Sequence, residues 1–127
     1  MAERSTPEGR VRISEEVVAT IAGLAANEVP GVAGMMGSLV SGLGERLGRK
    51  NPQKGVKVEL GEAEANLDLY LVVDYGARIP EVAQKVQEGV RQAVENMTGL
   101  AVPAVNIHVQ GVAFPPELAD PGPKPEA

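Results

Sequence analysis

The residues that could do chemistry are few, and the first is a lone histidine. His108 is the only histidine in the 127 residues, and cysteine is absent. It lies on the polar side of an alternating run, Val105–Gln110. A general base needs an orienting partner, and a metal-binding histidine needs further ligands. We interpret His108 as a solvated side chain or one on the second face of the sheet, and an enzyme that uses it with nearby acids is our third-ranked hypothesis.

Carboxylates also gather in one part of the sequence, at Glu59, Glu62, Glu64 and Asp68. Carboxylate oxygens suit a hard cation, but the spacing does not match a calcium-binding loop. Nothing in the sequence implies a cleft between two of these acids. The cluster is typical of a solvated hairpin tip, and we expect no catalytic residues, cofactor or metal.

A glycine-rich segment, residues 37–54, offers a different kind of site. Its glycines fit neither the phosphate-loop pattern nor the dinucleotide fingerprint. Apolar residues nevertheless recur at helical spacing, although each interior glycine costs about 0.5–1 kcal/mol relative to alanine. Basic residues follow within 46–57. A basic, apolar-faced segment can lie on an anionic membrane or an acidic partner; the alternative is a surface helix that covers part of the sheet.

Methionines make such a face adaptable to partners. The candidate partner or membrane-surface contacts are Met35, Met36, Leu39, Leu43, Arg46, Arg49, Lys50 and Lys54.

Composition limits the function classes. The net charge is −5, which argues against general nucleic-acid binding, and so does the scarcity of aromatic residues for base stacking. No apolar run approaches the roughly 18 residues of a membrane span, and the N-terminus lacks a secretory pattern. The absence of cysteine excludes disulfides and thiolate catalysis. We expect a cytoplasmic protein without a transmembrane segment of its own.

One strand-turn-helix unit, residues 66–97, organises the rest. Alternation over Leu67–Tyr75 predicts a half-buried strand, with Val72 suggesting cover on its second face. A helix with an apolar stripe from Ile79 to Met97 follows, with Pro80 in its first turn and Gly99 at its C-cap. The helix is long enough to return the chain along the sheet, so a strand at 105–109 should be parallel to the first.

Further elements complete the expected domain. Residues 56–60 form a strand that makes a hairpin with the central one, and 10–13 form a short strand at an edge. Ser14 caps a helix in which Val17, Ile21, Leu24 and Glu28 lie on one line, with Val18, Ala22 and Ala25 beside it, and this stripe is apolar until Glu28. Residues 31–36 are a weak strand or an extended connector.

The predicted fold class is α+β: a two-layer sandwich with a small mixed β-sheet and two main helices on one face. The expected order is roughly β-α-(β)-(α)-β-β-α-β. Residues 1–9 are a flexible N-terminus, 10–114 are a single domain, and 115–127 are a disordered proline-rich tail.

Several stretches together resemble the alkaline shock protein family of envelope stress response proteins in Gram-positive bacteria. They are I-S-E-E-V, E-V-P-G-V, K-G-V-K-V, Y-G-A-R-I-P-E-V and V-N-I-H-V-Q-G-V, within residues 9–114. The resemblance implies no enzymatic activity and no catalytic residues. It implies a self-associating homo-oligomer, held near the inner face of the cell membrane by a membrane-embedded anchoring protein, that serves cell envelope homeostasis under alkaline or general stress.

The first functional hypothesis is therefore a non-enzymatic scaffold or interaction protein at the cytoplasmic face of the membrane. The alternative is a binding module for a small anionic ligand or RNA, which would use the basic segment 46–57.

Overall fold

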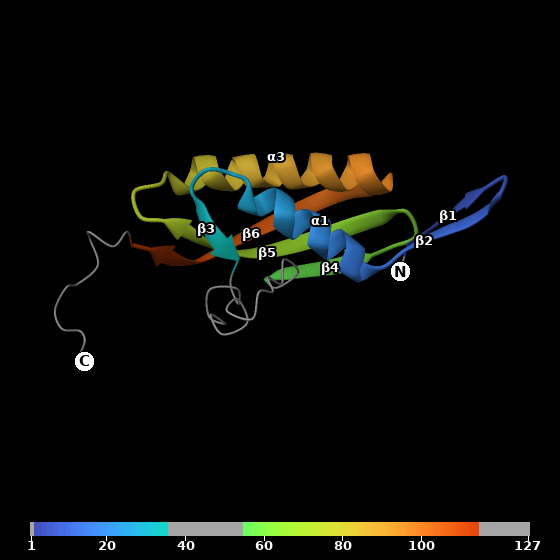
Figure 1. Cartoon of the computed structure of the whole chain (residues 1–127), viewed down its shortest axis with the longest axis horizontal. Coiled ribbons are helices and arrows are strands. Elements are labelled where there is room, and N and C mark those ends of the chain that lie inside the picture. Colours follow the sequence, from blue (N-terminus) through green and yellow to red (C-terminus); the bar gives the residue numbers. More distant parts are fainter. Residues whose placement is uncertain (1, 36–54, 115–127) are drawn as a thin grey trace.

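A computed structural model describes residues 2–35 and 55–114 (Figure 1). The elements in chain order are β1 (Ala2–Thr6), β2 (Gly9–Ile13), α1 (Glu15–Asn27), β3 (Val32–Met35), β4 (Val56–Leu60), β5 (Glu64–Asp74), α3 (Ile79–Thr98) and β6 (Ala101–Ala113). The predicted glycine-rich segment, residues 37–54, and the proline-rich tail, residues 115–127, lie outside the described residues.

Strand β5 is the centre of the main sheet, as the alternating pattern predicted. Leu67, Leu69 and Leu71 have no exposed surface, because their side chains share the face that packs on the helices. Val72, on the other face, is 6% exposed, so the second face is also covered at this position. The strand starts two residues earlier than expected, at Glu64.

Both edges of β5 are paired. Strand β6 runs parallel to it along almost its whole length, which confirms the predicted crossover through α3. The other edge is shared: β4 pairs antiparallel with Ala65–Leu69, and β3 pairs antiparallel with Leu71–Val73. The predicted hairpin and the weak strand at 32–35 are thus both present. Strand β3 ends at Met35 and strand β4 begins at Val56, and these two residues pair with nearby positions of β5.

The N-terminus corrects the sequence interpretation. Residues 2–6, which we expected to be flexible, form β1 and pair antiparallel with β2 in a separate two-stranded sheet. The hairpin projects from one end of the molecule (Figure 1). Its base joins the core through Ala2, and Arg12 donates a hydrogen bond of 3.0 Å to Glu3 across the pair. Polar side chains hold this hairpin, so no apolar alternation marked β1 in the sequence.

Helix α1 begins as predicted but buries a different line. The Ser14 hydroxyl accepts a hydrogen bond of 3.3 Å from the Val17 amide, which satisfies one of the free N–H groups at the helix start. The buried residues are Val18, Ala19, Ala22, Gly23 and Ala26. By contrast Val17 is 47% exposed and Leu24 is 53% exposed. Small residues let α1 approach its neighbours closely. Ile21 of the predicted line does pack against the core, whereas Val17 and Leu24 were assigned to it wrongly.

Helix α3 has the expected ends and a narrower buried stripe. A proline occupies the first turn, and Gly99 adopts the left-handed conformation at φ 77°. Val82, Val86, Val90 and Val94 are buried at intervals of four. The predicted stripe was too long at both ends, because Ile79 is 41% exposed and Met97 is 71% exposed.

The two helices lie side by side on one face of the main sheet (Figure 1). The aliphatic core fills the space between the layers. The predicted α+β fold with helices on one face is confirmed.

Candidate functional site

The predicted contact segment lies almost wholly outside the described residues. Of its eight candidates, Met35 alone belongs to a described element, and its side chain is fully buried in the core. Strand pairing explains this, since Met35 faces the helices opposite Leu71. In this structure Met35 therefore serves packing and does not present a contact surface. The remaining seven stay a prediction.

The histidine has a partner that the sequence did not reveal. His108 Nε2 lies 3.0 Å from Asp68 Oδ1, and the imidazole stacks on Tyr70 with ring centroids 4.5 Å apart. The parallel register creates this cluster. It places β6 beside β5 and so brings together two side chains that lie 40 positions apart in the sequence. The side chains of His108 and Asp68 are 41% and 37% exposed, so the pair lies at the surface of the sheet face opposite the helices.

The pair changes the acidity of the carboxyl group. The hydrogen bond from His108 is the main cause that lowers the pKa of Asp68 below its usual value. Partial burial opposes this effect, while a hydrogen bond from Asn106 and the charges of His108 and Lys57 add to it. Such a carboxylate–imidazole pair cross-links two strands, and it could orient a proton carrier.

The predicted acid cluster is spread along the hairpin. Glu59, Glu62 and Glu64 are exposed, and Asp68 is partly buried. Within residues 2–35 and 55–114, no group of three or more histidine or acidic side chains is placed to hold a metal ion.

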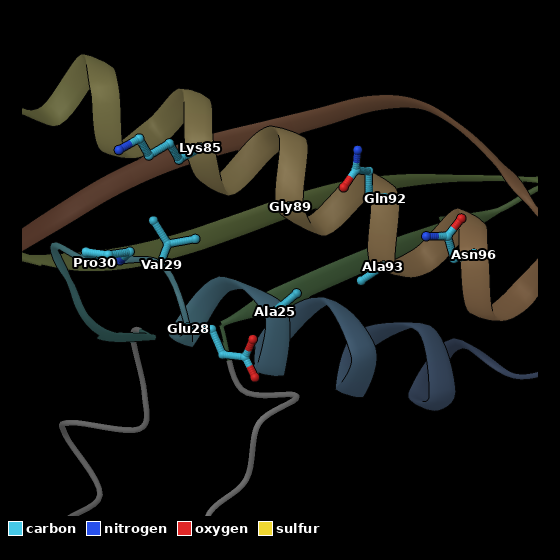
Figure 2. A pocket seen from close by; sticks show the side chains of 9 residues that line it. All are labelled: Ala25, Glu28, Val29, Pro30, Lys85, Gly89, Gln92, Ala93 and Asn96. Carbon is cyan, nitrogen blue, oxygen red and sulfur yellow. The ribbon is translucent and has the colours of Figure 1, made fainter.

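An open groove of about 440 Å³ runs between the two helices (Figure 2). Ala25 of α1 and Ala93 of α3 point towards each other across it, and Gly89 has no side chain to fill the gap. Glu28 and Lys85 bring opposite charges to its lining, and Gln92 and Asn96 add amide groups. The groove exists because small residues face each other here, a feature that a search for large apolar residues overlooks.

Large apolar side chains also reach the surface at the end of the main sheet. Tyr75 and Phe114 stack with ring centroids 5.2 Å apart, at the ends of the neighbouring strands β5 and β6. Val112 and Ile79 are 44% and 41% exposed at the same end. A gathering of large exposed apolar side chains at one end of a domain is typical of interaction sites. The sequence placed Tyr75 and Ile79 in buried runs, because periodicity does not show where a covering element ends.

No helix in the described parts of the chain combines the length and apolar character needed to cross a bilayer.

Known proteins of similar sequence cover most of this chain. The chain is 46% identical to YqhY of Bacillus subtilis over 114 residues, which cover 90% of this chain and 84% of that protein. It is 42% identical to YloU of the same organism, over 87% of this chain and 93% of that protein. A stress response regulator gls24 homolog of Streptococcus pyogenes is 30% identical over 80% of this chain, although the match spans 57% of that longer protein.

Among solved structures, a MamM-CTD chain is similar at a TM-score of 0.49 and 17% identity, covering 77% of this chain and 99% of that one.

Residues 3–114 match the alkaline shock protein 23 family, which is described as having a cell envelope-related function. This match takes in the hairpin, both helices and the whole main sheet. The chain therefore belongs to the alkaline shock protein 23 family.

Proposed function

We propose that this protein is a non-enzymatic stress-response protein, which self-associates and acts as a scaffold at the cytoplasmic face of the cell membrane. The observation that carries the proposal is the match of residues 3–114 to a family with a cell envelope-related function. A relative named as a stress response regulator supports the stress role. The alkaline shock resemblance supports self-association and a membrane-embedded partner.

The geometry offers surfaces for such a role. The two-layer core supports exposed apolar residues in four places: Val11 on β2, Val17 and Leu24 on α1, Met97 on α3, and the end of the main sheet. Proteins seldom expose extended apolar surface unless it meets a partner. The groove between the helices adds a concave surface with charged and amide groups in its lining. In this proposal the protein works by presenting surfaces to other proteins.

The experiment separates a protein anchor from the lipid itself. The full chain would be sedimented with membranes from its native host, with the same membranes after protease treatment, and with protein-free vesicles of the same lipids. We expect binding to the native membranes, loss of binding after protease, and no binding to the vesicles. Equal binding to all three would refute a protein anchor, and binding to none would refute the membrane location.

A variant and its control test whether the basic residues outside the described part of the chain contact the partner. Replacing Arg46, Arg49, Lys50 and Lys54 together by alanine should weaken membrane binding if they contact the partner. The control is Arg10→Ala with Arg78→Ala, which removes two exposed cations and leaves the bond between Arg12 and Glu3 in place. Equal binding by both variants would exclude the basic segment from the contact.

A further inference from the structure

Strand β6 has one edge on β5 and a second edge that faces away. Helix α3 covers part of this second edge with polar side chains. Arg91 and Gln87 donate hydrogen bonds of 3.1 and 3.0 Å to the carbonyl oxygens of Val102 and Val105, and Glu95 accepts one of 3.1 Å from the Val102 amide. These bonds satisfy backbone groups that would otherwise be free to pair with another strand.

The edge continues beyond this cover. Successive residues of a strand direct their peptide groups to opposite edges, so Ile107 and Val109 share the outward direction of Val105. After the bulge near Gly111, the Ala113 carbonyl accepts a hydrogen bond from the Tyr75 amide, which lies on the β5 side. Ala113 therefore faces β5, and its neighbour Val112 faces outward. Among the described residues, no side chain bonds the outward groups of Ile107, Val109 or Val112.

The stripe of α3 that lies along the β6 edge changes from polar to apolar where its side chains stop covering that edge. Gln87, Arg91 and Glu95 are spaced by four on α3, and the same stripe continues towards the helix start as Ala83 and Ile79. Because α3 runs opposite to β6, these two residues lie towards Val112, at the end where the edge is free. Ile79 and Val112 are both more than two-fifths exposed. The free half of the edge is thus flanked by apolar side chains, and the covered half by polar ones.

The free half also lacks the charges that normally protect an edge. Residues 104–113 contain no lysine, arginine, aspartate or glutamate. Two other peripheral strands do carry charges, as Arg10 and Arg12 in β2 and Lys57 and Glu59 in β4 show, whereas the short β3 carries none. A long uncharged edge strand invites pairing with another strand.

We propose that the free edge of β6, residues 107–113, pairs antiparallel with the same edge of a second copy of this chain, about a two-fold axis. Such a pairing is self-complementary. With the axis at His108, it sets Ile107 of one copy opposite Val109 of the other on the helix side, and His108 opposite its equivalent on the other face. The strip contains no acidic residue, so two copies with a net charge of −5 each meet where repulsion is least. The inference rests on the self-association in the proposed function and names the surface.

Two variants disturb this edge and leave in place the backbone groups that face β5, although Val109 itself also packs partly on the core. Val109→Pro removes one outward N–H group, and Val112→Lys places like charges at the junction. Leu24→Lys is the control, because Leu24 is exposed on α1 and remote from β6. Circular dichroism first confirms that each full-length variant is folded, and sedimentation velocity then measures the dimer dissociation constant. We expect both edge variants to weaken dimerisation by about tenfold or more, and the control to match the original protein.

A cross-link locates the contact independently. The chain contains no cysteine, so Val109→Cys and the control Leu24→Cys each carry one thiol. A short bismaleimide should join two copies at position 109 and leave the control unlinked. If the original protein dimerises but the edge variants behave like it, this inference fails and self-association stands. A protein that stays monomeric at every concentration overturns both. Cross-linking of position 109 to a different protein in a cell extract, and not to itself, overturns the choice of a second copy.

Discussion

At the scale of single residues, Gly31 joins the start of β3 to helix α3. Its φ is +100°, and a Cβ added there would lie 2.7 Å from Val82 Cγ2. Its carbonyl also accepts a hydrogen bond of 2.8 Å from the Asp74 amide. The position therefore requires both the left-handed backbone and the lack of a side chain. Gly89 is different, because a Cβ there would meet nothing within 4 Å.

These two glycines give a matched prediction. Gly31→Ala should lower the free energy of unfolding by about 2 kcal/mol or more, through backbone strain and overpacking against Val82. Gly89→Ala should raise it by about 0.5–1 kcal/mol, because alanine favours a helix interior. Urea denaturation of both variants measures the two changes. A neutral Gly31→Ala would contradict the close approach of β3 and α3.

The Asp68–His108 pair predicts a pH dependence. The pKa of Asp68 is lowered in the folded protein from its ordinary value of 3.8, chiefly by the hydrogen bond from His108. The unfolded chain therefore binds the proton more readily, so the stabilisation is present above pH 3.8 and is lost as the pH falls through the folded pKa. The effect should stay below about 1 kcal/mol, because both side chains are solvated.

The test compares the original protein with Asp68→Asn by urea denaturation at pH 7 and at pH 3. The original protein should be the more stable of the two at pH 7, and the difference should shrink at pH 3. A difference that is equal at both values would show that the carboxylate charge contributes nothing to stability.

At the scale of elements, the success of the sequence analysis depended on the size of the buried residues. Strand β5 was predictable because leucines alternate with polar residues, and only burial on one side explains that pattern. Helix α1 was predicted with the wrong buried line because its core side is largely alanine and glycine. Such a face signals close packing between helices, yet a search for large apolar residues passes over it.

The orientation of α1 is tested by two adjacent residues of one type. Val18→Ala should lower the free energy of unfolding by about 1–3 kcal/mol, because it leaves a cavity in a fully buried site. Val17→Ala should change it by less than about 0.5 kcal/mol, because half of that side chain is exposed. Thermal denaturation followed by circular dichroism measures both. The opposite order would restore the line predicted from the sequence.

At the scale of the whole molecule, fold and function were predictable to different degrees. The mixed sheet with helices on one face follows from local patterns and from the rule for parallel crossovers. The candidate surfaces do not, since each depends on long-range pairing. The register of β5 and β6 brings Asp68 to His108, and α3 decides which half of the β6 edge is covered. The two members of each contact lie far apart in the sequence, so no local sequence pattern reveals them.

The last prediction concerns the dependence of stability on concentration. If two copies pair through β6, the folded state is stabilised by mass action, and Tm should rise with protein concentration. Each tenfold increase should add about 1.4 kcal/mol per mole of dimer, once the folded protein is mostly dimeric. Calorimetric scans at three concentrations would measure this trend. Because Val112→Lys disrupts the pairing while leaving the core unchanged, its Tm should be independent of concentration. A Tm that rises equally for this variant would place the contact between copies on another face of the molecule.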